Sequence, residues 1–202
     1  MAEPSAIWST KLIVFDKSLG IAQNVIMSHG RVALQGLIAR IDQLYQLVRD
    51  GPPIENVHVH QDIPVTLSDL CFQQGIASTV LFNSGPRSTR ENKAAYKLRL
   101  DRVEYVRKAC TGVPTDILSN RDIRNRLTHI DEFLGLTAPD TGWFIDSAMR
   151  RRDEFSPPPG IKVAFCRTYI SSEDVLQHLD KEMSISALRN EAAGVLNAIW
   201  PQ

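Results

Sequence analysis

Three residues in this chain combine types and spacing that suit one reaction: Arg124, Asn125 and His129. A histidine side chain ordinarily titrates near neutrality and can take or give a proton. An arginine is always cationic and binds phosphate oxygens through two N–H groups, while an asparagine can orient the ring or a phosphate. Together these types suffice to cleave RNA through its own 2′-hydroxyl, with charge on the phosphate stabilised and no metal required.

The three residues are expected to lie on a helix over residues 115 to 136. Its core stripe is spaced four, three and four residues apart and consists of Ile123, Leu127, Ile130 and Leu134. At about 100° per residue, the opposite face collects Arg121, Asn125, Thr128, His129 and Glu132. Arg124 projects roughly 140° away from His129. The two side chains therefore converge only if Arg124 reaches around the helix, or if a second copy contributes across a two-fold interface.

The pattern Arg124-Asn125-x-x-x-His129 resembles the signature of the HEPN superfamily, small helical proteins that include metal-independent ribonucleases. Members carry an arginine and a histidine with four to six residues between them, often with a polar residue directly after the arginine. The resemblance covers about residues 20 to 136 and extends to a subgroup of uncharacterised bacterial bundle proteins. It implies a homodimer whose two motifs face a shared cleft, with RNA as the substrate. His129 would be the acid/base, Arg124 the phosphate clamp and Asn125 the orienting group.

Acidic residues next to the motif keep other interpretations open. Asp131 stands where one toxin subgroup has a tyrosine, and the Asp131-Glu132 pair would repel an RNA backbone. A second hypothesis is a non-enzymatic dimeric helical-bundle module that binds a nucleotide or protein partner through the same face. A third is a plain surface helix on which Arg124 pairs with an acidic neighbour. The RNA target and any antitoxin or other protein partner stay open.

Composition limits the class of protein. The 202 residues fit one domain, or a domain with an appendage, and 23 Lys+Arg balance 23 Asp+Glu. This balance argues against coating duplex nucleic acid through phosphate contacts, although a local basic cluster is compatible with it. The three cysteines are an odd, widely separated set, so neither a disulfide framework nor a zinc site is expected. No leader or membrane span is predicted. We therefore expect a cytoplasmic protein without a cofactor.

Apolar periodicity elsewhere predicts a mainly α fold, an antiparallel up-and-down helical bundle of HEPN type with a small C-terminal β-hairpin plus helix. The further predicted helices cover residues 6–27, 31–50, about 66–83, 88–111 and 186–200, with a break near His29-Gly30. A capping box, Ser88-x-x-Glu91, is expected to open the third long helix. Residues 1–155 would form the bundle, and residues 156–202 an appendage packed on it.

The segment after the proline-rich linker at residues 156–160 is rich in β-branched and aromatic residues. It predicts a strand over residues 161–170, paired with residues 175–179 in a hairpin. The alternative for the second half is a helix capped by Ser172. A short extended piece is expected around His58-x-His60, where two histidines without a third ligand indicate loop residues rather than a metal site. The run from Arg150 to Arg152 is expected to be a solvated face.

Overall fold

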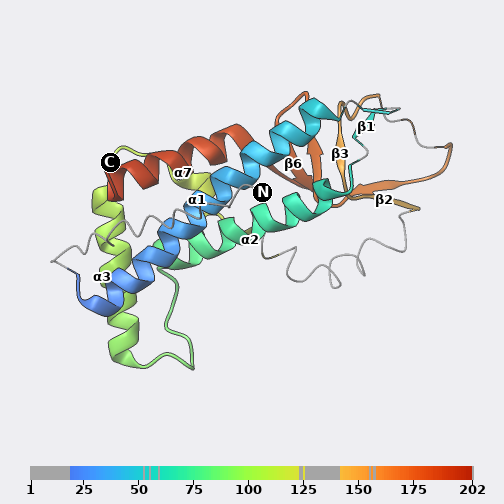
Figure 1. Ribbon diagram of the computed structural model, residues 1–202. Coiled ribbons are helices and arrows are strands. Elements are labelled where there is room, and N and C mark those ends of the chain that lie inside the picture. The colour runs from blue at the N-terminus through green and yellow to red at the C-terminus, as the bar shows by residue number, and fades with distance from the viewer. Residues whose placement is uncertain are drawn as a thin grey trace, which may run out of the picture.

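The computed structural model describes residues 19–51, 53–54, 56–58, 60–122, 125, 142–154, 156 and 158–201. Its helices are α1 (Ile21–Asp50), α2 (Asp62–Phe82), α3 (Lys93–Ala109), α4 (Asp116–Ser119) and α7 (Ile185–Ile199). Its strands are β1 (Val57–His58), β2 (Trp143–Ile145), β3 (Ala148–Met149), β4 (Val163–Phe165), β5 (Thr168–Ile170), β6 (Val175–His178) and β7 (Lys181–Ser184). Figure 1 shows the long helices toward one end of the molecule and the strands toward the other.

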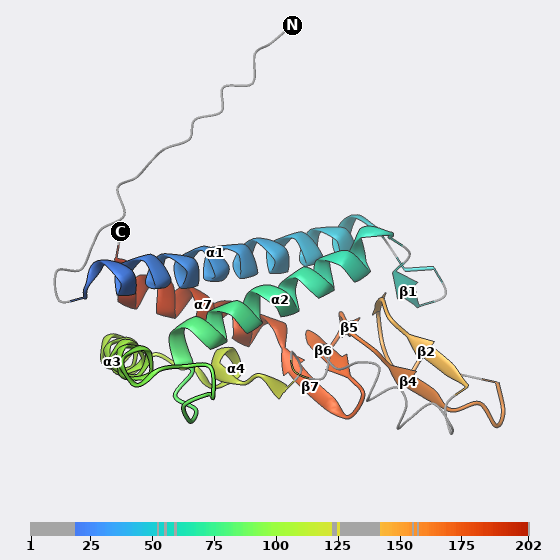
Figure 2. The ribbon, with the colours of Figure 1, turned by 90° about the horizontal axis from the view of Figure 1, so that it is seen from below.

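The core lies between α1, α2 and α7. The first two helices run antiparallel, and α7 packs against α1 (Figures 1 and 2). Their shared apolar faces are buried, and the fully buried members include Leu34, Leu37, Ile41, Leu44, Ile63, Leu67, Leu70, Leu81, Ile185, Leu188, Ala192 and Val195. Burial of this apolar area is the main force that holds the three helices together.

Gly30 does not break a helix, contrary to the prediction from sequence. It lies inside the 30-residue helix α1, which is continuous from Ile21 to Asp50. A Cβ atom at Gly30 would lie 2.6 Å from the Cδ2 atom of Leu81. The glycine therefore lets α1 and α2 approach closely, and the absence of a side chain serves packing rather than chain reversal.

The strands form a five-stranded mixed sheet in the order β1-β3-β5-β6-β7 and a separate parallel pair, β2-β4. In the larger sheet β3 and β5 are parallel, and the other neighbours are antiparallel. Between β4 and β5 the chain passes from one sheet to the other through Arg167, whose φ is 43°. The predicted mainly α bundle with only a small hairpin is therefore wrong, because the chain is a mixture of helices and sheet.

The reason for this error is the length of the strands. Each has only two to four residues, too few to produce the alternation that marks a strand in sequence. The predicted hairpin is confirmed for β5 and β6, with Thr168 opposite Gln177, and the alternative helix capped by Ser172 is wrong. The single strand predicted over residues 161–170 is divided, because β4 pairs with β2 instead of β6. Strand β3 pairs with β1 and β5, which lie far from it in the chain, so no local sequence pattern predicts these pairings.

Two predicted helix boundaries also differ. The capping box is wrong because Asn92 caps α3, accepting from the Ala95 N–H, while Glu91 pairs with Arg99 instead. The predicted continuous helix from residue 115 is interrupted at Asn120, whose φ and ψ of −72° and 126° are extended. Most of the predicted helix beyond that point lies outside the described residues.

In the part of the chain that the structure describes, no helix combines the length and the apolar character needed to cross a bilayer. Cys71, Cys110 and Cys166 are free thiols, and all three are buried.

Candidate functional site

The predicted catalytic residues are described only in part. Arg124 and His129 lie outside the described residues, so their predicted convergence stays a prediction. Asn125 is exposed and helical, and its backbone N–H donates to the Arg121 carbonyl at 2.7 Å. The structure does describe residues 115–122, the segment that leads into the motif, and this segment is held in place by buried polar side chains.

The first of these side chains is Glu191 on α7. Glu191 is 7% exposed, and its carboxylate accepts from the N–H groups of Ile117 at 3.3 Å and Leu118 at 2.7 Å. These are amides in the first turn of α4, which have no acceptor within the helix itself. A carboxylate at a helix N-terminus also interacts favourably with the aligned peptide dipoles. Glu191 therefore caps α4 from a helix more than 70 residues away in the chain.

The second buried side chain is Gln74 on α2. Its amide group donates to the carbonyls of Leu118, at 3.1 Å, and Asn120. The neighbouring Ser78 hydroxyl donates to the Ser119 carbonyl at 3.0 Å. Both side chains are at most 2% exposed, and a buried polar group is costly unless it is hydrogen-bonded. The turn before the motif is thus held from α7 at its start and from α2 at its end.

Beyond this turn the chain resumes a helical course. The Asn120 side-chain oxygen accepts from the Asp122 N–H at 2.8 Å, as in an Asx turn, and the Asn125 N–H bonds one turn back. Asn120 therefore ends α4 and also fixes the direction in which the motif segment leaves it.

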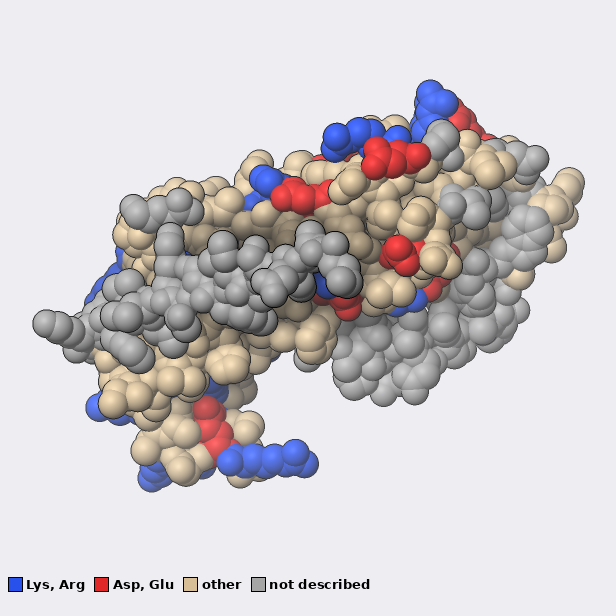
Figure 3. Space-filling view, in the orientation of Figure 1, with Lys and Arg blue, Asp and Glu red and all other residues tan. Residues whose placement is uncertain are grey.

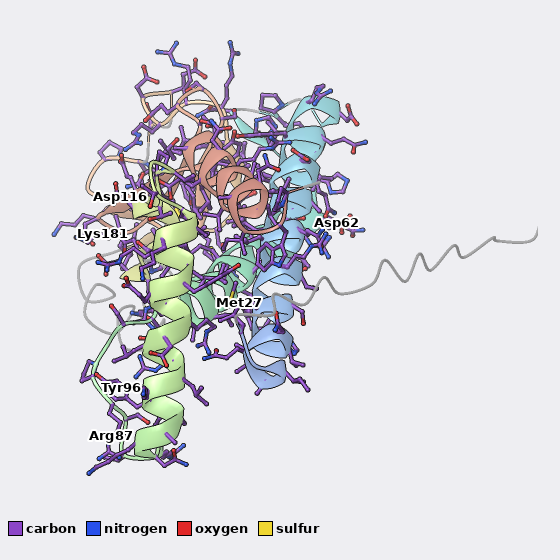
Figure 4. The ribbon with its side chains drawn as sticks, turned by 90° about the vertical axis from the view of Figure 1, so that its left-hand side faces the viewer. Met27, Asp62, Arg87, Tyr96, Asp116 and Lys181 are labelled. Carbon is purple, nitrogen blue, oxygen red and sulfur yellow. The ribbon has the colours of Figure 1, made fainter. Side chains whose placement is uncertain are left out.

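A hollow of about 250 Å³ lies between α4 and β7, beside the start of the motif segment. It is lined by Asp116, Ile117, Asn120, Asp122, Lys181, Glu182, Met183 and Ser184. Figure 4 shows Asp116 and Lys181 close to each other on the face that carries α3. Glu182 is paired with Arg152, so two further carboxylates, Asp116 and Asp122, face the one ammonium group of Lys181. The excess of negative charge makes this wall unfavourable for phosphate at neutral pH. Any phosphate bound here would need cations from the motif itself.

A second polar cluster joins α1, the β5–β6 turn and α7. The hydroxyls of Tyr45 and Tyr169 both donate to the Asp174 Oδ1 atom, each at 2.9 Å, and Oδ2 accepts from the Ser186 N–H at 2.8 Å. Burial and the neighbouring carboxylate raise the pKa of both tyrosines. Burial alone would raise the pKa of Asp174, but the bonds from Ser186 and the tyrosines lower it overall. The protons stay on the phenols, so the cluster is a structural link rather than a base.

The two histidines that precede α2, His58 at the end of β1 and His60 in the loop after it, have separate partners. His58 is 3% exposed, with Nδ1 hydrogen-bonded to the Gly51 carbonyl at 2.8 Å. The Nδ1 atom of His60 accepts from the Asp62 N–H at 3.2 Å. Across the described ranges, no group of three His, Cys, Asp or Glu side chains could hold a metal ion.

The arginine run after β3 is largely neutralised. Arg151 pairs with Asp153 at 2.6 Å, and Arg152 pairs with Glu173 at 2.6 Å and Glu182 at 2.8 Å. These ion pairs fit the solvated face expected from sequence.

Gln74 and Glu191 were missed by reasoning from sequence. Each interrupts an apolar stripe, Gln74 following Leu70 and Cys71, and Glu191 following Leu188. A polar residue at a core position of an amphipathic helix is the signal that could have found them, because such a residue needs a buried partner.

Comparison of this chain with protein-family models, curated proteins and solved structures finds no match.

Proposed function

We propose that this protein is a metal-independent RNA endonuclease that uses Arg124, Asn125 and His129. His129 takes the proton from the RNA 2′-hydroxyl or gives one to the leaving 5′-oxygen. Arg124 binds the phosphate and offsets its growing charge, and Asn125 orients the ring or the phosphate. We place the reaction in the cytoplasm and name no cofactor.

The observation that carries the proposal is the anchoring of the segment that enters the motif. Glu191 and Gln74 hold residues 117–120 through buried hydrogen bonds from two different helices. Catalytic groups need a supporting shell that fixes their position, and a fixed point of departure for residues 121–125 supplies part of one. The anchoring and the residue types together support the proposal. A surface helix whose position does not matter would need no buried hydrogen bonds at its start.

The acidic hollow bears on the assembly. Asp116 and Asp122 repel a phosphate backbone, Lys181 offsets only one of these charges, and the charge of Glu182 is offset by Arg152. We therefore include a homodimer in the proposal, with two copies of Arg124 facing a shared cleft. Four guanidinium and ammonium groups would then oppose the carboxylates that line the two hollows.

The test is cleavage of a labelled, structured RNA in EDTA by the wild type and by His129→Ala. Removing a general acid or base slows a reaction by about 100-fold to 10,000-fold, so the variant should be at least about 100-fold slower. His60→Ala serves as a matched control because His60 is another histidine, partly exposed, in the loop just before α2. Equal rates for the wild type and His129→Ala would contradict the proposal, provided that circular dichroism shows both to be folded.

The second candidate function is binding without cleavage, and the acidic lining of the hollow favours it. A dimeric module that recognises a nucleotide or a protein partner needs no phosphate clamp poised for reaction. Under this alternative, RNA stays uncut and Arg124→Ala weakens dimerisation or binding. Cleavage of RNA separates the two candidates. The mass of the wild type in solution tests both, because a wild-type monomer would weigh against each.

A further inference from the structure

The neutral net charge of this protein conceals a strongly basic segment. Residues 87–108, here called the arm, contain 8 Lys and Arg and only 3 Asp and Glu of the chain's 23 and 23. The rest of the chain therefore has 15 basic and 20 acidic residues. The arm and the remainder carry opposite net charges, and only the arm has the sign that attracts a polyanion.

The arm projects from the helical layer. Figure 1 shows α3 crossing the end of the α1–α2 pair and extending below it, and Figure 4 shows Arg87 at the far end with Tyr96 nearby. Its attached part is secured by Arg102, which is 6% exposed and donates to the Val80 carbonyl at 2.8 Å. Val106 is also buried there, whereas residues 92–95 at the start of α3 are exposed.

Several cations hold the shape of the arm. Arg99 binds both carboxylate oxygens of Glu91 at 2.9 Å and also donates to the carbonyls of Asn83 and Gly85. Near the attached end, Arg107 and Lys108 pair with Glu104. These contacts use two of the three carboxylates of the arm and leave its tip with an excess of positive charge.

The tip carries the cations that are available to a partner. Arg90, Lys93 and Lys97 are exposed, and no carboxylate among the described residues forms an ion pair with them. Arg87 is also exposed and donates to the Glu91 carbonyl. No acidic residue lies in the first turn of α3, so the helix dipole adds further positive potential. Figure 3 shows Lys and Arg side chains toward the end of this projection, with acidic side chains beside them.

We infer that the arm docks the phosphate backbone of single-stranded RNA. A helix of 17 residues is about 25 Å long, enough to follow several phosphates rather than one. The Arg99 guanidinium lies 5.1 Å from the centre of the Tyr96 ring, and Leu98 beside it is 48% exposed. Planar and apolar side chains among cations provide surfaces on which bases stack, which an acidic peptide would not use. The choice of RNA rests on the proposed function, whereas the charge asymmetry does not.

The test measures binding in a His129→Ala background, so that cleavage does not interfere. The arm variant combines Arg90→Gln, Lys93→Gln and Lys97→Gln, and the probe is a fluorescein-labelled single-stranded RNA of mixed sequence. Each lost phosphate contact on a single strand lowers the salt dependence of log K by about 0.7. Three lost contacts reduce the slope by about 2. Raising the salt from 50 to 200 mM lowers the affinity of both proteins for RNA. Measured by fluorescence anisotropy, the factor by which the affinity falls should be roughly 20 times smaller for the arm variant than for the protein with an intact arm.

The matched control combines Arg31→Gln, Arg49→Gln and Arg150→Gln, which make the same change in net charge outside the arm. The control should keep the wild-type slope. The inference would be overturned if the arm variant kept the wild-type salt slope. It would also be overturned if the salt slope of the control fell as much as that of the arm variant. Displacement of the RNA by polyglutamate of equal charge as effectively as by unlabelled RNA would overturn it in favour of an acidic protein partner.

The two proposals fail in distinguishable ways. If the His129→Ala protein binds RNA through the arm but the wild type never cleaves RNA, the proposed function fails and the docking inference stands. If the wild type cleaves RNA and the arm variant keeps the wild-type salt dependence, the docking inference fails and the nuclease proposal stands.

Discussion

Replacing Glu191 with glutamine should loosen the turn that leads into the motif and destabilise the fold. The carboxylate now accepts two backbone N–H groups, from Ile117 at 3.3 Å and Leu118 at 2.7 Å. A glutamine of the same shape has one acceptor oxygen. If that oxygen keeps the shorter bond, the amide NH₂ group faces the Ile117 N–H, and two donors are left opposed in a buried place.

The size of the effect follows from these contacts. A hydrogen bond to a charged group contributes about 1.5–3 kcal/mol, and a buried group left without its partner costs about 1–3 kcal/mol. Removing a charge from the interior relieves part of its desolvation cost, which offsets some of this loss. We expect a net decrease of about 2 kcal/mol in the free energy of unfolding. With a urea dependence of about 2 kcal/mol per molar, the midpoint should fall by about 1 M.

Urea unfolding followed by circular dichroism measures this change. Glu104→Gln is the matched control, because Glu104 forms exposed ion pairs with Arg107 and Lys108 that contribute less than about 1 kcal/mol. Amide hydrogen exchange at Leu118 should also accelerate in Glu191→Gln. A midpoint equal to that of the wild type, with unchanged exchange at Leu118, would refute the anchoring role of Glu191.

Two further predictions concern packing and pH. Gly30→Ala should destabilise by about 1–3 kcal/mol in a thermal melt, because its Cβ would lie 2.6 Å from Leu81. Gly36→Ala, whose Cβ would have the flexible Gln73 side chain as its nearest neighbour at 3.1 Å, should cost less than Gly30→Ala, and equal losses for both would contradict the close-packing argument. The lowered pKa of Asp174 means that its carboxylate stabilises the fold above its ordinary pKa of about 4. That stability is lost as the pH falls through the lower pKa of the folded state. In urea melts, Asp174→Asn should therefore lower the free energy of unfolding more at pH 7 than at pH 3, and an equal decrease at both pH values would contradict this reasoning.

The helices were predictable where a long apolar stripe repeats at helical spacing. The second long helix and the final one follow their stripes closely, and the β5–β6 hairpin follows its run of β-branched residues. The third long helix is present but begins at Lys93 rather than at Ser88. A helix break was wrongly predicted at Gly30, because a glycine that ends a helix looks the same in sequence as a glycine that allows two helices to touch. Only the position of Leu81 across the helix pair distinguishes these cases.

The mixed sheet could not be predicted because its strands are short and its pairings are non-local. Val57 pairs with Met149, more than 90 residues later, and neither strand is longer than two residues. The same limit applies to the anchored turn. Gln74 and Glu191 reach residues 117–120 only in the folded chain, so their role is visible in three dimensions and not in spacing. The catalytic assignment itself depends on residue types and stays a prediction.

The most direct test of the central claim is the chemistry of the RNA ends produced in EDTA. Attack by the 2′-hydroxyl, with His129 as acid or base, leaves a 2′,3′-cyclic phosphate on one fragment and a free 5′-hydroxyl on the other. We predict these ends with the wild type and no fragments with His129→Ala. Products with 3′-hydroxyl and 5′-phosphate ends, or cyclic ends formed equally by the variant, would contradict the account.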